Sequence, residues 1–535
     1  MTNKNISRRE FLARTGAFGV FGAAYYGMVK YGMLPAERAY AGPPRFDYQI
    51  GEGQQVVILG AGIAGLCAAY LLRNTRFKVT VIEPSSYVGG RCLTLRRGDI
   101  VAEEHADRLG RPFRPRICDF DKGADFYFNA GAGRIPQSHS AVLHYCKKLK
   151  IKLQPYIFAC RSNLLQNDNF NHGRPVPLRW IKHDLRGYIA ELLAHVARTD
   201  MLNQFVKPDN HETFLQFVQY FGDLRDSDQT LKYLNTSRVG YGKKPGAGLN
   251  AGVLRQPFDL KDLLETEIWQ TGLFNDMYLY WQSSLMQAEG GMDQIPRGFR
   301  DNLGPNTRIQ LNVKVTNLSQ TADKILIHHS NSDEPLEADY CISTMAPPLL
   351  GRMLDVSFPQ IFKSALTKIY MVPACKIGWQ ARSRFWEEEN EIYGGISWTK
   401  HIIQQIWYPS QGFHSEKGIL TGAYNYGGGA QTFGLMSHEE RLAAAREGGE
   451  KLHPGRFMPN VEKGISIAWQ NMPYQAGGWA YYKDQAENSA FLAINKPQGR
   501  LVLAGDYLSF LSGWMEGAVR SAEHAVKRIA VMTNL

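Results

Sequence analysis

The sequence lacks a cysteine pattern, an internal repeat and a block of like charges, and each absence excludes a class of protein. Its seven cysteines among 535 residues are odd in number and scattered, with no Cys-x-x-Cys pair, which argues against a disulfide framework. Neither cysteines nor histidines have metal-ligand spacing, so no metal site is expected. The net charge of +11 comes without a basic cluster or nucleic-acid module, and nucleic acid is therefore not an expected partner.

The sequence contains enough apolar residues for a large hydrophobic core. Hydrophobic residues make up 44% of the chain and aromatic residues 12%, which excludes a disordered or fibrous protein. A chain of 535 residues exceeds one core and predicts two or three packed units.

The first 41 residues are typical of a twin-arginine export signal. Ser7-Arg8-Arg9-Glu10-Phe11-Leu12 precedes a glycine-rich, moderately apolar run over residues 15–29, and Ala39-Tyr40-Ala41 is a small-x-small cleavage site. Because the run is short and Lys30 interrupts it, a removed signal is favoured over a membrane anchor. We expect a periplasmic or extracellular protein with no stable membrane insertion after the signal is removed.

The remaining chain is organised around residues 55–91. The apolar run Val56 to Leu59 predicts a buried parallel strand, Gly60-Ala61-Gly62-Ile63-Ala64-Gly65 turns into a helix ending near Leu72, and residues 78–82 predict a second strand. Glu83 follows that strand directly. Strand, glycine turn, helix, strand and acid in this order predict a dinucleotide-binding unit.

Each residue of this motif has a physical task. Gly60 permits the tight turn, Gly62 lets the backbone approach a pyrophosphate at the helix N-terminus, and Gly65 lets helix and strand pack closely. Glu83 lies where a carboxylate accepts hydrogen bonds from a ribose diol.

Later segments indicate where the other parts lie. Residues 181–285 have apolar residues at helical spacing, including MYLYWQSSLMQ at residues 277–287, and residues 308–318 alternate as a strand paired with 324–328. Residues 500–504 return to a buried strand before a helix from Gly513 onward. A nucleotide-binding unit completed by the far end of the chain requires interleaved domains.

Taken together, these motifs resemble the flavin-containing amine oxidases, and within them the L-amino-acid oxidases. Gly89-Gly90-Arg91 is similar to that family's second glycine motif, which favours FAD over NAD. The remaining landmarks, in chain order, are Gly131-Ala132-Gly133-Arg134-Ile135-Pro136, residues 290–296, Lys376 with Trp386, Ala423-Tyr424, Gly477-Gly478-Trp479, residues 503–507 and residues 513–518.

The resemblance implies an α/β fold in which an FAD-binding Rossmann-like domain is interleaved with a mixed-sheet substrate domain and an inserted helical domain. The expected boundaries are residues 54–127, 288–370 and 495–535 for the FAD domain, 128–180 and 371–494 for the substrate domain, and 181–287 for the helical domain. The family's cofactor contacts carry over to Gly60, Gly62, Ile63, Ala64, Gly65, Glu83, Pro84, Gly90, Arg91, Gly131, Ala132, Gly133, Arg134, Val315, Asp506, Trp514, Met515 and Ala518.

The same resemblance assigns the substrate contacts. Arg134 would grip the substrate carboxylate through two parallel hydrogen bonds, helped by Tyr424, and Lys376 would hold a water near flavin N5. Tyr426, Trp479, Gly513 and Trp514 would line the side-chain pocket. The alternatives are a structural ion pair for Arg134, a lysine that reaches solvent for Lys376, and core packing for the aromatic residues.

The implied activity is oxidative deamination of L-amino acids to 2-oxo acids, ammonia and hydrogen peroxide, by hydride transfer to flavin N5 and reoxidation by O2. No cysteine lies near residues 513–518, so the FAD is expected to be non-covalent. The resemblance also allows a homodimer. The alternatives are an amine or polyamine oxidase, an amino-acid 2-monooxygenase, and a flavoprotein without enzymatic activity.

Overall fold

The computed structural model describes residues 40–227 and 230–533. The twin-arginine pattern at residues 7–12 lies outside the described residues, as does Ala39 of the expected cleavage site. Backbone contacts divide the chain into residues 1–43 and 44–535, and the following description concerns the second unit. In the described part of the chain, no helix is both long and apolar enough to span a membrane.

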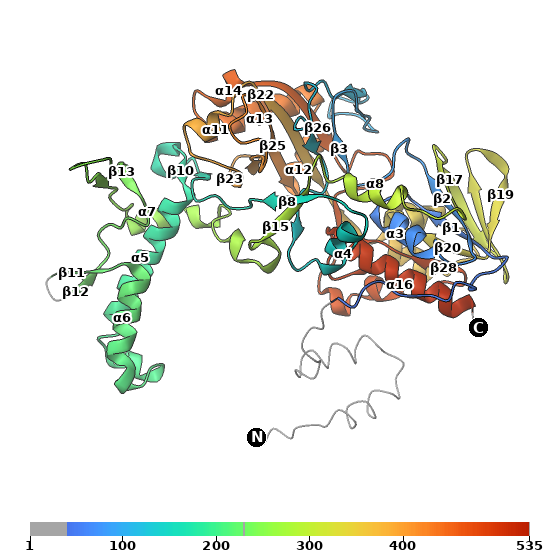
Figure 1. The fold of residues 1–535 in the computed structure, drawn as a ribbon, viewed down its shortest axis with the longest axis horizontal. Coiled ribbons are helices and arrows are strands. Elements are labelled where there is room, and N and C mark those ends of the chain that lie inside the picture. The colour runs from blue at the N-terminus through green and yellow to red at the C-terminus, as the bar shows by residue number, and fades with distance from the viewer. Residues whose placement is uncertain (1–39, 228–229, 534–535) are drawn as a thin grey trace. The chain divides into compact units, whose positions relative to one another are not determined.

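One sheet has five parallel strands in the order β16-β2-β1-β20-β28. Its strands are β1 (Gln55–Leu59), β2 (Lys78–Glu83), β16 (Thr307–Leu311), β20 (Tyr340–Ser343) and β28 (Leu501–Leu503). The helix α3 (Ile63–Leu72) connects β1 to β2 and packs against the C-terminal helix α16 (Met515–Thr533) (Figure 1). Strands from both ends of the chain thus share one sheet, as the interleaved arrangement predicts.

One strand prediction needs correction. Residues 308–318 were expected to form a single strand, but the chain breaks at Asn312, whose φ is +58°. β16 therefore joins the parallel sheet, whereas β17 (Val315–Gln320) pairs with β18 (Ile325–His329) in a separate antiparallel sheet completed by β19 (Ser332–Ala338). The predicted pairing with residues 324–328 is confirmed for β17 alone.

A second, seven-stranded sheet is mixed and has the order β10-β9-β23-β24-β25-β22-β26. Only the pair β9 and β23 runs parallel among its described neighbours. All eight residues of β22 are buried, since both faces of this strand are covered. The strands are β9 (Leu164–Gln166), β10 (Val176–Pro177), β22 (Ala374–Ala381), β23 (Ile396–Thr399), β24 (Gln405–Trp407), β25 (Gly418–Tyr426) and β26 (Val461–Ala468).

The region 181–287 is less uniformly helical than its periodicity predicts. It holds α5 (Leu178–Val196), α6 (His211–Gly222) and α7 (Leu260–Glu265), together with the hairpins β11–β12 (Arg225–Ser227, Thr230–Lys232) and β13–β14 (Tyr241–Lys243, Val253–Leu254). The helix expected over residues 277–287 is wrong. This segment forms short 3-10 turns (Asn275–Met277, Leu279–Trp281) and then β15 (Leu285–Ala288), where pairing with β7 (Ile135–Pro136) and β8 (Leu153–Tyr156) overrides the helical pattern.

The α/β fold class is confirmed, whereas the domain boundaries stay a prediction. The other α-helices and strands of the described residues are β3 (Thr94–Leu95), β4 (Ile100–Val101), β5 (Arg116–Ile117), β6 (Phe128–Asn129), α4 (Ser140–Lys148), α8 (Gln294–Arg300), α9 (Pro347–Met353), α10 (Gln360–Thr367), β21 (Tyr370–Val372), α11 (Phe385–Glu388), α12 (Gly428–Gly434), α13 (His438–Leu452), α14 (Phe457–Asn460), β27 (Trp479–Tyr481) and α15 (Ser489–Ile494).

Candidate functional site

A long cavity begins at the glycine turn between β1 and α3. Gly60 has a φ of +102°, and its N–H donates to the carbonyl of Ile82 over 2.8 Å. A Cβ on Gly65 would lie 1.9 Å from the Gly60 oxygen, whereas one on Gly62 would meet nothing within 4 Å. The N-terminus of α3 has no side-chain cap, so its N–H groups face the cavity free to bind an anion.

Glu83 lies at the carboxyl end of β2, on the wall of the same cavity. Its Oε2 accepts from the Ala61 N–H over 2.8 Å and its Oε1 from the Ser85 N–H over 2.9 Å. Burial raises the pKa of the Glu83 carboxyl, although both backbone donors oppose the rise. Each carboxylate oxygen keeps a lone pair for a ligand hydroxyl, as the ribose contact requires.

Further along the cavity, Arg91 and Asp506 form an ion pair. Arg91 Nη2 lies 2.6 Å from Asp506 Oδ1, and Nη1 donates to the Gly478 carbonyl over 2.6 Å. Asp506 Oδ2 accepts from the Gly513 N–H over 2.8 Å. This pair fixes the turn before α16 against the Gly89-Gly90-Arg91 loop.

Lys376 is the third residue of β22 and is 3% exposed. Its Nζ donates to the Gly131 carbonyl over 2.6 Å and to the Asn129 carbonyl over 3.2 Å. It also lies 4.5 Å from the Trp407 ring centroid. Burial, with a smaller contribution from the charge of Arg134, lowers the pKa of Lys376 to about 7. The amine therefore does not reach solvent, and it can hold or release a proton near neutral pH.

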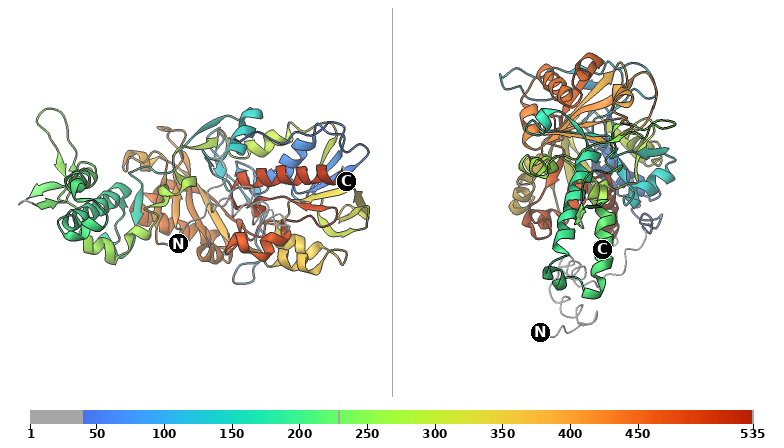
Figure 2. Two further views of the ribbon diagram at one scale, coloured as in Figure 1. Left: turned by 90° about the horizontal axis from the view of Figure 1, so that it is seen from below. Right: turned by 90° about the vertical axis from the view of Figure 1, so that its left-hand side faces the viewer.

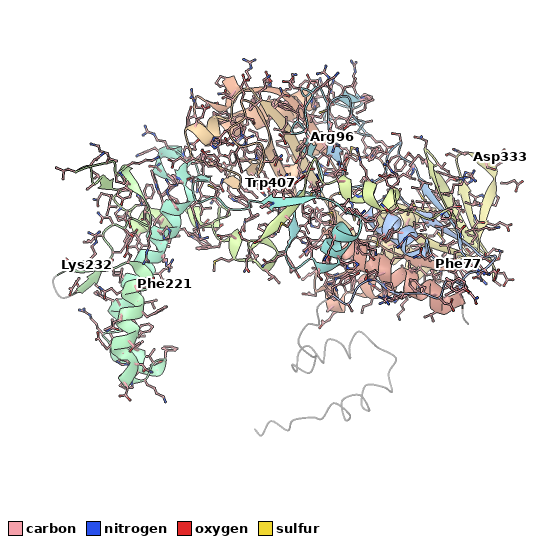
Figure 3. The ribbon with its side chains drawn as sticks, viewed as in Figure 1. Phe77, Arg96, Phe221, Lys232, Asp333 and Trp407 are labelled. Carbon is pink, nitrogen blue, oxygen red and sulfur yellow. The ribbon has the colours of Figure 1, made fainter. Side chains whose placement is uncertain are left out.

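Arg134 lies in a box of aromatic rings. Its guanidinium carbon is 5.0 to 5.5 Å from four ring centroids, those of Phe158, Trp281, Trp407 and Trp514. Trp407 is marked in Figure 3. The Nε atom is buried without a hydrogen-bond partner. No described aspartate or glutamate forms an ion pair with Arg134, so the structural ion pair considered above is absent from this part of the chain.

Two tyrosines, Tyr156 and Tyr424, lie beside these aromatic rings. The Tyr156 hydroxyl is buried, and burial raises the pKa of Tyr156 to about 12, although the charge of Arg134 and a side-chain interaction with it oppose the rise. Tyr424 lies on β25 directly opposite Lys376 on β22, with its ring 5.0 Å from that of Trp407. Burial raises the pKa of Tyr424 to about 12. Both phenols are therefore neutral donors at ordinary pH.

Two further groups of rings extend the wall. Trp479 contacts Tyr426 with centroids 5.9 Å apart. Trp514 contacts His139 at 5.0 Å and Tyr280 at 6.0 Å. Burial lowers the pKa of His139 to about 4, so this ring is neutral and acts as packing surface for Trp514.

Most of the predicted residues line the cavity, and a few lie behind its wall. The predicted residues that line it are Gly60, Gly62, Ile63, Ala64, Glu83, Pro84, Gly90, Arg91, Gly131, Ala132, Val315, Lys376, Tyr424, Trp479, Asp506, Gly513, Trp514, Met515 and Ala518. Gly65 packs α3 against β1, and a Cβ on Gly133 would lie 2.8 Å from the Trp407 ring. Arg134 and Tyr426 contact the lining residues Trp514 and Trp479.

Several lining residues were missed. Thr344, Met345 and Ala346 follow β20, and the carboxyl ends of parallel strands meet at one edge of a sheet, so this placement could have been found. Trp469 lines the cavity and donates its Nε1–H to the Ala130 carbonyl over 3.0 Å. Trp281 and Trp407, which contact Arg134, were also missed. The sequence does not indicate these contacts, because they join segments that are far apart in the chain.

A glycine turn at the carboxyl edge of a parallel sheet, with an acid at the end of the second strand, is the arrangement typical of dinucleotide-binding folds. The family described as flavin-containing amine oxidoreductase matches residues 63–530. Because this match spans most of the sequence, the chain belongs to that family. It is therefore an oxidoreductase, and its family implies a flavin cofactor.

The named proteins that the chain resembles are also oxidases. The chain is 28% identical over 506 residues to an L-amino-acid oxidase of Siganus canaliculatus, covering 91% of this chain and 87% of the relative. It is 24% identical to a flavin-dependent L-tryptophan oxidase of Lentzea aerocolonigenes, covering 89% and 98%. The solved structure of a cyclohexylamine oxidase from Brevibacterium oxydans matches with a TM-score of 0.58 at 17% identity, over 90% of this chain and all of the other. That likeness supports the fold alone.

Proposed function

We propose that the chain catalyses the FAD-dependent oxidative deamination of L-amino acids to 2-oxo acids, ammonia and hydrogen peroxide, with O2 as the electron acceptor. The observation that carries this proposal is the partly buried side chain of Arg134, whose Nε is buried without a hydrogen-bond partner and which forms no ion pair with a described carboxylate. A cation that is partly withdrawn from water and has no counter-charge is a favourable place for an anion, and a substrate carboxylate would supply that counter-charge. The L-amino-acid oxidases among the relatives support the same substrate class.

The residues on the cavity wall fit a bound FAD. Gly62 leaves open space at an uncapped helix N-terminus, where a pyrophosphate would bind, and the Glu83 carboxylate suits a ribose diol. The flavin, when bound, supplies the two-electron acceptor that amino-acid oxidation requires. Cys92 lies on the wall, where burial raises the pKa of its thiol and its Sγ contacts the Met292 carbonyl at 3.2 Å. A protonated, engaged thiol is a poor nucleophile, which supports non-covalent binding.

Arg134 would bind the substrate carboxylate and thereby fix the orientation of the α-carbon. The neutral hydroxyls of Tyr424 and Tyr156 are available as further donors to the same carboxylate. The surrounding tryptophan rings lower the local polarity around Arg134, which strengthens these charge-assisted hydrogen bonds.

Lys376 would act beside the reacting centre through its proton. With a pKa of about 7, its amine is divided between charged and neutral forms at neutral pH. The Gly131 and Asn129 carbonyls accept hydrogen bonds from two of its N–H groups, and a third position on the nitrogen can hold a water or a proton.

A matched pair of substrates tests the proposal. L-phenylalanine and 2-phenylethylamine differ only by the carboxylate, so anaerobic addition of the amino acid should bleach the flavin absorbance, whereas the amine should leave it unchanged. Bleaching by the amine alone would favour an amine or polyamine oxidase. Bleaching by neither, nor by any other L-amino acid, would indicate a flavoprotein without this activity. Export through the twin-arginine pattern at residues 7–12 is part of the same proposal.

A further inference from the structure

The indole of Trp407 lies close to both cations of the candidate site. The Nζ atom of Lys376 is 4.5 Å from the centroid of this ring, and the guanidinium carbon of Arg134 is 5.0 Å from it. The face of an aromatic ring carries a negative potential and attracts a cation that lies within about 6 Å of its centroid. One side chain therefore stands within cation–π range of both groups.

The surroundings of Trp407 fix the orientation of its ring. Trp407 ends β24, where it is 8% exposed and pairs with Thr421 of β25. The strands β24, β25 and β22, drawn in orange, lie side by side in the seven-stranded sheet (Figure 2). The Nε1–H group of the indole donates to Gln405 Oε1 over 2.7 Å, and Gln405 is itself buried. Backbone pairing and this hydrogen bond leave the ring little freedom to turn away from the two cations.

The glycine before Arg134 leaves room for the same indole. A Cβ on Gly133 would lie 2.8 Å from the Trp407 ring, so a methyl group there would displace the ring. Without a side chain, the backbone that leads into Arg134 can lie directly against the indole. Gly133 thus couples the position of the ring to that of the arginine that follows it.

Aromatic rings surround the Lys376 amine where a carboxylate would be expected. In the described residues, no aspartate or glutamate forms an ion pair with this amine. Tyr424 lies directly opposite on β25, with its ring centroid 5.0 Å from Nζ and with a phenol that stays neutral, and β26 presents Ile467 on the other side. After burial, the charge of Arg134 is the second cause that lowers the pKa of Lys376. The two cations therefore repel each other across this group of rings.

We infer that Trp407 is a positioning residue whose ring holds Arg134 and Lys376 in place and offsets the repulsion between these two cations. The inference rests on the proposed function, in which the arginine binds the substrate carboxylate and the lysine holds a proton. A ring stabilises a cation without occupying its hydrogen-bond donors, whereas a carboxylate of the protein would compete with the substrate. When a carboxylate binds Arg134, the repulsion on Lys376 falls, and the amine takes up a proton more readily.

Fluorinated tryptophan in place of Trp407 tests this inference, because fluorine withdraws electron density from the ring face and changes the shape of the indole little. Amber suppression would place a tryptophan with three fluorine atoms at this one position of the flavin-loaded chain. The pKa of Lys376 is measured from the unfolding free energy of each protein relative to its Lys376→Met counterpart, between pH 5 and pH 10. The weaker cation–π interaction should lower that pKa by about 0.5 to 1 pH unit.

The same fluorinated residue in place of Trp379 is the matched control. Trp379 is fully buried on the same strand as Lys376, but its ring lies 4.6 Å from the guanidinium carbon of Arg446. Fluorine there should leave the pKa of Lys376 unchanged. A pKa that does not fall with fluorine at Trp407, or that falls equally with fluorine at Trp379, would overturn the inference and leave Trp407 a packing residue.

Binding of phenylpropionate separates this result from a failure of the proposed function. The compound keeps the carboxylate and phenyl group of L-phenylalanine but has no amine to oxidise, and its affinity is measured from the flavin absorbance. Trp407→Leu should weaken its binding by about 10-fold, and an unchanged affinity would refute the role of the indole in holding Arg134. A wild type that does not bind phenylpropionate would refute the carboxylate clamp of the proposed function, whereas the effect of fluorine on Lys376 is measured on stability alone.

Discussion

Arg91 Nη2 lies 2.6 Å from Asp506 Oδ1, although 415 residues separate the two in the sequence. The aspartate side chain is 7% exposed, and its second oxygen is held by the Gly513 N–H. One ion pair thus connects the second glycine motif to the turn that begins α16. Two segments of the cavity wall that are far apart in the sequence are thereby held together.

Asp506→Asn should loosen that connection. The amide keeps an acceptor for Gly513 but loses the charge that partners Arg91, so we expect a cost of about 1–3 kcal/mol and faster flavin release. Thermal unfolding and flavin loss on dialysis measure the two effects. Asp323→Asn is the control, because this residue is 90% exposed in its ion pair. Unchanged melting and flavin retention in Asp506→Asn would contradict the role of the pair.

Substitution of Arg134 should separate substrate binding from general stability. Arg134→Lys keeps a positive charge but loses the planar fork, and we expect kcat/KM for L-amino acids to fall by about 100-fold or more. Steady-state kinetics at fixed oxygen measures this loss. Arg174→Ala, at an exposed arginine, should leave the kinetics unchanged. An Arg134→Lys variant with wild-type KM and turnover would exclude the clamp.

Lys376 should impose a pH dependence on stability. Burial lowers its folded-state pKa from 10.5 to about 7, so between these values the unfolded chain binds more protons and stability rises with pH. Lys376→Met removes this penalty. Its advantage in unfolding free energy should be largest below pH 7, at up to a few kcal/mol, and should vanish towards pH ~10.5.

Denaturant titrations at pH 6, 8 and 10 measure that difference. Lys261→Met, at a lysine whose side chain is 74% exposed, should show no such trend. A difference between Lys376→Met and wild type that stays constant from pH 6 to pH 10 would mean that the amine does not titrate in this range.

The glycine turn should tolerate no side chain at Gly65. A Cβ there would lie 1.9 Å from the Gly60 oxygen, so Gly65→Ala must displace the turn, at a cost of about 1–3 kcal/mol and with weakened flavin binding. Gly428→Ala places the same methyl group where nothing lies within 4 Å. Calorimetry and flavin titration should therefore separate the two variants, and equal behaviour would refute the packing argument.

The sequence predicts those parts of the candidate site whose residues lie close together in the chain. The turn from Gly60 to Gly65 and the acid Glu83 are read from neighbouring residues, because one strand–turn–helix–strand unit contains them all. The break at Asn312 was not visible, since the apolar alternation runs through it. The aromatic box was also missed, because Phe158, Trp281 and Trp407 meet at Arg134 only after three separate segments have folded. Residues 277–287 have helical periodicity, but β15 pairs with β7 and β8. These partners lie far away in the chain, so the local sequence does not indicate the pairing.

The most direct measurement of the central claim is a product assay on the purified protein with a panel of L-amino acids and amines, in which hydrogen peroxide and 2-oxo acid are scored together. The account predicts equal amounts of peroxide and 2-oxo acid from L-amino acids and neither from amines. Peroxide from amines would contradict the assignment of Arg134, and an amide in place of the 2-oxo acid would contradict the oxidase reaction in favour of a 2-monooxygenase.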